Sequence, residues 1–206
     1  MASLITTDII RYQPSEYKKS LRSHVLHPHS DITIVCIIWS EKENVTSVVE
    51  DHFLETISSS EWKHGQEDSD VSFVTEKYNH FLSNLAVEDE KGVRIIFAVE
   101  RDGRLMVSSI GECEVILQED DVSPSSIHED TRWHHRFELI SSGEIPMNSS
   151  VFIVSKNLDG ILGDSFYADC SESESGAFAE TAKEVLSREV NDTVHMVRIR
   201  RSPWAW

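Results

Sequence analysis

Three histidines stand close together near the start of the chain, at His24, His27 and His29. Imidazole is a common metal ligand, so a cluster of this kind could hold a transition metal. Pro28 favours an extended or turn conformation between them, and the spacing matches no established metal-binding motif. We therefore interpret residues 24–29 as a polar loop that precedes a strand.

A histidine pair, His134 and His135, and one cysteine, Cys113, are further candidates for chemistry. Neighbouring residues on a strand point to opposite faces, so the pair is not expected to bind one metal ion jointly. Cys113 follows a turn glycine and could in principle act as a thiol nucleophile. The flanking carboxylates Glu112 and Glu114 would raise its pKa, so we interpret Cys113 as a small buried side chain.

The elements that must position these residues follow from the apolar pattern. Strands are predicted for residues 4–12, 32–39, 95–100, 105–110, 115–117, 137–140, 151–154 and 193–199. Asp102-Gly103 indicates a tight hairpin, because a type I′ turn needs positive φ, and residues 95–117 are expected to form a β-meander. The run from Ile32 to Ile38 lacks polar alternation and predicts a strand buried on both faces.

Helices are predicted wherever apolar residues recur at helical spacing. A capping box at Ser47 and Glu50 predicts the start of one helix, and residues 71–85 and 171–190 predict two more, with a polar linker over 61–70. Amphipathic helices that alternate with buried strands predict an α+β fold. We expect a four-layer α/β/β/α sandwich of two antiparallel sheets flanked by helices.

Composition narrows the possible partners. With 206 residues, the chain fits one domain over residues 1–202, followed by a short aromatic tail at 203–206. A formal net charge of −17 disfavours nucleic acid and anionic membranes as partners. No signal peptide or membrane span is evident, and the three cysteines do not suggest a disulfide framework. We expect a cytoplasmic protein.

The order of elements over residues 30–200 resembles that of the metal-dependent type 2C protein phosphatases. The hairpin at Asp102-Gly103 and the corner Gly111-Glu112-Cys113-Glu114 are similar to the family's central hairpin, which ends in a Gly-Asp-Ser-Arg-like corner. This resemblance implies the same four-layer sandwich. It also implies that a site for two divalent metal ions would lie at the ends of the strands.

The acidic motifs of that family are degenerate in this chain. The strand that should end in Asp-Gly-His-Gly-Gly ends in Ile38-Trp39-Ser40-Glu41, Lys156 stands where a ligand Asp is expected, and Val190 replaces an Asp before the last strand. Hard divalent ions need oxygen ligands, and two-metal activation of water needs clustered carboxylates. We therefore predict no catalytic, cofactor-binding or metal-binding residues and no cofactor.

Three functional hypotheses remain from the sequence. The first is a catalytically inactive phosphatase-like domain, or pseudophosphatase, with a regulatory or protein-binding role. The second is an active divergent serine/threonine phosphatase that uses Mg²⁺ or Mn²⁺ through relocated ligands such as Asp31, Asp159 or Asp192. The third is an unrelated α+β binding protein.

The end of the chain is basic and aromatic although the rest is acidic. Its notable residues are Arg198, Arg200, Arg201 and the peptide Ser202-Pro-Trp-Ala-Trp206. Because Trp and Arg are enriched at binding hot spots, we predict an intermolecular contact there. The alternative is that the two tryptophans fold back onto their own domain.

Overall fold

Two antiparallel sheets form the centre of the structure, a computed structural model that describes residues 3–14, 20–63, 65–85, 92–128, 131, 134–156, 158 and 161–203. Within these residues each sheet has five strands. The first sheet has the order β1 (Ser3–Tyr12), β10 (Val194–Pro203), β9 (Ser149–Val154), β6 (Glu114–Gln118) and β7 (Ser125–Ser126). The second has the order β2 (Ser20–Leu26), β3 (Ile32–Ser40), β4 (Arg94–Arg101), β5 (Arg104–Ile110) and β8 (Ser141–Glu144).

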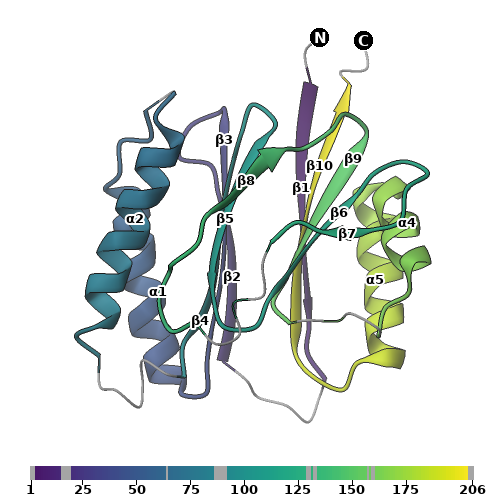
Figure 1. Ribbon diagram of the computed structural model, residues 1–206. Helices are drawn as coiled ribbons and strands as arrows, with labels where there is room; N and C mark the ends of the chain where they lie inside the picture. The colour runs from purple at the N-terminus through teal and green to yellow at the C-terminus, as the bar shows by residue number, and fades with distance from the viewer. Residues whose placement is uncertain are drawn as a thin grey trace.

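Helices cover the outer face of each sheet (Figure 1). The helices α1 (Glu43–Ser58) and α2 (Glu67–Leu82) lie on the β2–β8 sheet, and α4 (Asp164–Glu172) and α5 (Ser175–Glu189) lie on the β1–β7 sheet. Buried apolar residues form one cluster under each helical layer and a third between the sheets. The α+β fold class and the four-layer α/β/β/α sandwich are thus confirmed. None of the helices in the described residues has both the length and the apolar character that crossing a membrane requires.

Strand β3 shows why this architecture suits the sequence. Its Ile34, Cys36 and Ile38 side chains face α1 and α2, whereas Val35 and Ile37 face the other sheet. A strand with apolar side chains on both faces needs cover on both, and burial of each large aliphatic side chain contributes about 1.5–3 kcal/mol. The predicted doubly buried strand is confirmed.

The predicted hairpin at Asp102-Gly103 is also confirmed. Both residues have positive φ, +54° and +82°, and β4 and β5 pair directly on either side of them. The buried carboxylate of Glu100 accepts a hydrogen bond from the Gly103 amide at 2.8 Å. The positive φ of Gly103 favours glycine, and a Cβ atom there would also displace the end of the Arg201 side chain, whose Cζ would lie 2.3 Å away.

Strand β6 leaves the hairpin and joins the other sheet, so the meander prediction is wrong. It pairs with β9 in the register Glu114↔Val154 to Gln118↔Ser150. The chain turns away at Gly111, whose φ of +81° is in the left-handed region that glycine adopts readily. A short apolar strand fits either sheet, and only its long-range pairing decides which one it joins.

Several predicted boundaries also move. Residues 20–26 form strand β2 rather than part of a polar loop. Helix α1 begins at Glu43 after Lys42, so Ser47 lies inside the helix and does not cap it. Helix α2 begins at Glu67, inside the predicted linker. Local propensity places helix ends poorly because tertiary packing can extend a helix past a favourable cap.

Two more predicted segments differ in the second half of the chain. The strand predicted at 137–140 lies four residues later, as β8. The helix predicted over 171–190 begins later, as α5 at Ser175, and residues 171 and 172 end the separate helix α4. Ser173 and Glu174 divide the two helices with extended backbone, with ψ of 145° and 160°. The division lets α4 pack Phe166 and Tyr167 against the sheet beside Phe178 of α5.

Arg198 is not part of an exposed basic tail, which corrects that part of the tail hypothesis. Its side chain is buried and donates hydrogen bonds to Asp8, to the Cys170 carbonyl and to the Ser173 carbonyl. Strand β10 continues to Pro203, and residues 204–206 lie outside the described residues.

Candidate functional site

A hollow of about 200 Å³ opens at one end of the sandwich, where several strands end or begin. It is located where the phosphatase resemblance places the metal ions. It contains Trp39 from the end of β3, Glu112 from the β5–β6 corner, Lys156 from the segment after β9, and Asp192 from the segment before β10. The full lining is Leu21, Trp39, Arg94, Glu112, Ser155, Lys156, Asp192 and Thr193. Of the positions that the sequence comparison singled out, Trp39 and Lys156 line this hollow, whereas Val190 does not.

Lys156 and Asp192 form an ion pair across this hollow. The Lys156 ammonium lies 3.2 Å from Asp192 Oδ2, and the other carboxylate oxygen, Oδ1, accepts a hydrogen bond from the Thr193 amide at 2.8 Å. Both oxygens of Asp192 are therefore engaged within the protein. Lys156 supplies the cation that neutralises this carboxylate.

Arg94 and Glu112 form a second ion pair on the same hollow, with Arg94 Nη1 3.1 Å from Glu112 Oε2. The Arg94 guanidinium also stacks over the Trp39 ring, 4.6 Å from its centroid, because Trp39 and Arg94 are partners in the β3–β4 register. A Cβ atom at Gly111 would lie 2.6 Å from Arg94 Cγ, so the glycine at the corner makes room for this arginine.

The residues of this hollow do not fit two hard divalent cations. Such ions need several carboxylate or carbonyl oxygens, and the two carboxylates in the lining are each paired with a cation. The four charged side chains sum to zero, whereas a two-metal centre needs a strongly negative ligand set. Among the described residues, no group of three His, Cys, Asp or Glu side chains is arranged to hold a metal ion.

A buried histidine, His195, lies directly behind the hollow. Its backbone amide donates to Ser155 Oγ at 3.0 Å, and its Nδ1 atom has no hydrogen-bond partner among the described residues. Burial, together with the nearby cations Arg11 and Arg22, lowers the pKa of His195 to about 4. This imidazole is therefore neutral at physiological pH and provides no positive charge to the hollow.

Two of the residues suggested as relocated metal ligands, Asp31 and Asp192, do not come together. Asp31 precedes β3 and forms an ion pair with Arg101, at the end of β3 opposite to Trp39. Eight strand residues separate these two ends, which is roughly 26 Å. Asp192 is at the Trp39 end, so Asp31 and Asp192 cannot share an ion. Asp159 lies outside the described residues.

The early histidines do not converge either. His24 is on β2 and its Nε2 atom lies 2.6 Å from Glu50 Oε1 on α1. His27 Nδ1 lies 3.4 Å from Thr33 Oγ1, and His29 is exposed in the turn that follows. Each side chain therefore meets a different part of the β2–β3 region. The polar-loop interpretation is wrong for His24, because strand β2 extends to Leu26.

Cys113 is buried, as predicted, within a polar network that the sequence did not indicate. Its thiol donates to Ser109 Oγ, which lies 2.7 Å from His128 Nε2, and His128 Nδ1 lies 2.8 Å from Ser141 Oγ. The network joins β5, the β7–β8 connection and β8. Ser109 and His128 are both buried and line none of the larger hollows, so we assign the network a structural role.

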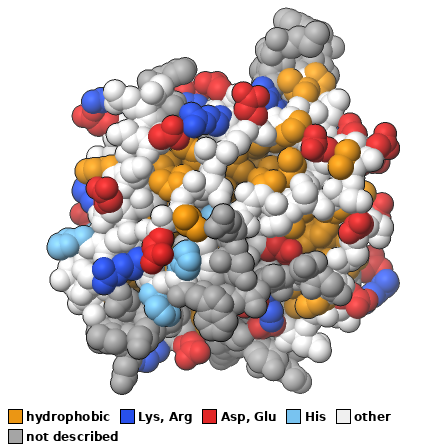
Figure 2. Space-filling model, in the orientation of Figure 1, with side chains coloured by type: hydrophobic (Ala, Val, Ile, Leu, Met, Phe, Trp, Pro, Cys, Tyr) orange, Lys and Arg blue, Asp and Glu red, His pale blue; other side chains and the backbone are white. Residues whose placement is uncertain are grey.

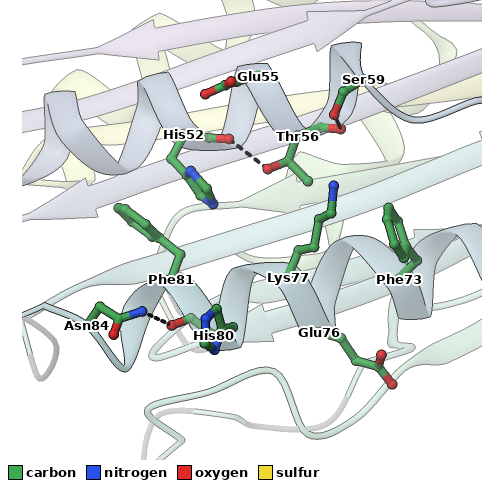
Figure 3. A pocket seen from close by; sticks show the side chains of 10 residues that line it. All are labelled: His52, Glu55, Thr56, Ser59, Phe73, Glu76, Lys77, His80, Phe81 and Asn84. Atoms are coloured by element: carbon green, nitrogen blue, oxygen red, sulfur yellow. Dashed lines mark hydrogen bonds between the residues drawn. The ribbon is translucent and has the colours of Figure 1, made fainter.

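The largest hollow, about 610 Å³, is an open groove between α1 and α2 (Figure 3). His52 stacks on Phe81 there, with ring centroids 4.0 Å apart, and Lys77 points toward α1. Burial lowers the pKa of His52 below its ordinary value. The hydrogen bonds of Thr56, Ser59 and Asn84 are made to backbone carbonyls of their own helices, so the groove shows no arranged acid, base or nucleophile.

Arg94 and Glu112 are the site residues that sequence reasoning missed. The sequence analysis considered Glu112 as part of the Gly111–Glu114 corner and as a neighbour of Cys113, but not as a partner of Arg94. The available signal was the antiparallel pairing of β3 with β4. It places Arg94 opposite Trp39 once the β3–β4 register is known. That register depends on a pairing between residues 55 positions apart, which local patterns do not reveal.

Comparisons with known proteins agree with this architecture. No family model and no curated protein matches the chain. Among solved structures, the S. agalactiae serine/threonine phosphatase has a TM-score of 0.75 at 6% sequence identity. The match covers 96% of this chain and 99% of that one. The PstP serine/threonine phosphatase catalytic domain, in complex with two manganese ions, has a TM-score of 0.74 at 10% identity, over 98% and 100%.

A third similar structure is the phosphatase domain of the cell fate determinant SpoIIE from Bacillus subtilis. Its TM-score is 0.65 at 10% identity, and the match covers 99% of this chain and 96% of that one. The TM-scores establish the fold, whereas sequence identities this low carry no information on chemistry. The chain has the type 2C phosphatase fold, as its sequence resemblance implied.

Proposed function

We propose that this chain is a type 2C phosphatase-like domain without metal-dependent phosphatase activity, and that it acts by binding a protein partner. One observation carries the first part. The hollow that corresponds to the metal centre holds two ion pairs, Lys156–Asp192 and Arg94–Glu112, where the reaction needs free carboxylates. The same fold then serves as a scaffold whose function depends on its surface.

The two ion pairs oppose metal binding in two ways. Each carboxylate would have to give up a cationic partner before it could bind a metal, and the released ammonium and guanidinium would then repel the metal. All four side chains are partly exposed, with exposures of 21–42%, so the pairs add little to stability. Their effect is on the charge of the hollow.

The proposal that the domain is inactive is tested by metal titration and turnover assays on the purified chain. Calorimetric titration with Mn²⁺ and Mg²⁺ is expected to show no saturable heat at micromolar metal. Hydrolysis of p-nitrophenyl phosphate and of phosphoserine and phosphothreonine peptides is expected to equal the blank with and without either metal. The matched control is Asp192→Asn, which removes the carboxylate best placed to be a ligand and should change neither result.

The opposite result is equally definite. Micromolar metal binding, together with metal-dependent turnover that persists through a second purification and is abolished by Asp192→Asn, would show that the domain is an active divergent phosphatase. Residual turnover that Asp192→Asn leaves intact would instead come from a contaminant.

A further inference from the structure

In the part of the chain that the structure describes, one side of the sandwich is open between its two sheets. Strand β7 is the last strand of one sheet and β8 the last strand of the other, and both lie at the front of the molecule (Figure 1). On the opposite side, β1 and β2 bring the other two edges together. The space between β7 and β8 therefore leads into the apolar layer that the two sheets share.

A hollow of about 310 Å³ occupies this opening. Its inner wall comes from the inter-sheet core, with Leu105 and Val107 of β5 and Val151 of β9. Its outer wall is β8 itself, from Ser141 to Glu144. A Cβ atom added at Gly143 would have no neighbour within 4 Å, so the wall is open at that position. The hollow is large enough to receive two or three apolar side chains.

Strand β8 also has an edge with no strand beside it among the described residues. Its inner edge pairs with β5, from Arg104↔Glu144 to Val107↔Ser141, and the sheet ends there. A free edge presents backbone N–H and C=O groups that an extended peptide can pair with. Short edge strands alone usually discourage pairing, but here an apolar hollow lies directly behind the edge.

Exposed apolar side chains are frequent in the segments that flank β7 and β8, and one of them, Ile127, lines the hollow. Figure 2 shows hydrophobic side chains in the middle of this face of the molecule. Of the nine large hydrophobic residues that are exposed in the described part of the chain, five flank β7 or β8 in sequence. They are Val122, Ile127, Leu139, Ile140 and Met147, with exposures of 36–54%. Such a concentration marks an interaction surface.

The charge of the opening selects among possible occupants. Glu144 is the charged side chain of its described lining, and its cross-strand neighbour Arg104 is bound instead to both carboxylate oxygens of Asp68, each at 3.0 Å. Glu144 thus lines the hollow at the end of β8, and the guanidinium of its cross-strand neighbour is engaged elsewhere. A lysine or arginine on the occupant would complement it.

Two other occupants fit less well. A second copy of this chain would bring two molecules of net charge −17 together, and Glu144 would be near its own counterpart. The C-terminal residues 204–206 are too short, because β7 lies three strands from β10, about 14 Å, and three extended residues span about 10 Å. A separate basic and apolar segment meets neither difficulty.

We propose that the opening between β7 and β8 binds an extended segment of a partner protein, in which apolar residues alternate with others and at least one lysine or arginine is present. The segment adds to the free edge of β8, its apolar side chains enter the hollow in front of Gly143, and its cation pairs with Glu144. Because this names the surface used for binding, it rests on the binding role proposed above.

The test uses a library of random nine-residue peptides displayed on phage and selected on the immobilised full-length chain. Gly143→Phe serves as counter-target, since it fills the hollow at a position with open space and no positive φ. Gly176→Phe is the matched control, because Gly176 also faces open space but lies on α5, in the other helical layer. Thermal melting confirms that each variant is folded.

The expected result is enrichment of peptides with alternating apolar residues and at least one lysine or arginine. Binding of the synthetic peptides, measured by fluorescence anisotropy, should fall at least tenfold with Gly143→Phe and stay unchanged with Gly176→Phe. Glu144→Lys should weaken the basic peptides by about tenfold, equivalent to about 1.4 kcal/mol, and offers a second test that leaves the hollow open.

Failure to find any peptide that distinguishes the wild type from Gly143→Phe would overturn this inference. So would sedimentation showing a dimer that Gly143→Phe dissociates, because the occupant would then be a second copy. Tighter peptide binding by a chain ending at Pro203 would assign the opening to the tail instead. None of these outcomes affects the metal and turnover assays, so the two proposals can fail separately.

Discussion

Arg198 on the last strand donates two hydrogen bonds, at 3.0 and 2.6 Å, to one carboxylate oxygen of Asp8 on the first strand. The two residues are direct partners in the β1–β10 register, although 190 positions separate them. Arg198 also stacks over Phe178, 4.2 Å from the ring centroid, and is 1% exposed. This arginine therefore joins the two ends of the chain to helix α5.

Asp8→Ala is expected to destabilise the domain by about 3–5 kcal/mol, because it leaves a buried guanidinium without its counter-charge. Urea denaturation of the two proteins measures the difference. Arg200→Ala, a half-buried arginine on the same strand, is the control and should change stability by less than about 0.5 kcal/mol. Equal effects of the two changes would show that the Asp8–Arg198 pair has no special importance.

Lys156→Asp is expected to create weak Mn²⁺ binding in the hollow at the end of the sandwich. The change removes a cation, frees Asp192 and adds a carboxylate beside Asp192 and Glu112, which supplies oxygen ligands. Calorimetry should give a dissociation constant on the order of 0.1–1 mM for this variant. Lys156→Met removes the same cation without adding an oxygen ligand and should show no binding. If Lys156→Asp does not bind Mn²⁺, the charge of residue 156 alone does not account for the lack of metal binding that we propose for this hollow.

His195 should make stability fall as the pH falls from 6.5 towards 4. The unfolded chain takes up a proton near the ordinary histidine pKa of 6.5, whereas burial lowers the pKa of His195 in the folded state to about 4. Its stabilising contribution is thus present above pH 6.5 and lost below, by up to about 3 kcal/mol.

Urea denaturation at pH 7 and pH 4.5 checks this contribution in wild type and in His195→Gln. The variant should lose less stability between the two pH values. His29→Gln, at an exposed histidine, should behave as the wild type does. If His195→Gln loses as much stability as the wild type, the acid sensitivity arises from other groups.

The aromatic residues 204–206 are predicted to make an intermolecular contact. A chain that ends at Pro203 should keep its melting temperature, since β10 and its pairing with β1 are complete at that residue. Its capture of a partner, or its mass in solution by sedimentation, should decrease. A lower melting temperature with unchanged mass and partner capture would show instead that the tail is a latch on its own domain.

The sequence alone determined the layered architecture and parts of the local structure. The doubly apolar run of β3 requires cover on both faces, and the left-handed pair Asp102-Gly103 requires a hairpin, so neither depends on distant residues. Lys156 likewise introduces a cation at a strand end where the family resemblance implies an acidic residue. These features depend on side-chain periodicity, steric restriction and charge sign, which are properties of short segments.

Only the tertiary structure decided which strands and charges meet. The apolar pattern of β6 fits either sheet, and the choice followed from its pairing with β9. The pairing of Lys156 with Asp192 and of Arg94 with Glu112 required the ends of four strands to converge, and no local signal specifies such partners. Arg198 appeared in sequence to belong to a basic tail, yet its strand carries it into the core opposite Asp8. Long-range pairing is a property of the whole fold, because the residues of one strand do not by themselves specify its partner strand or its register.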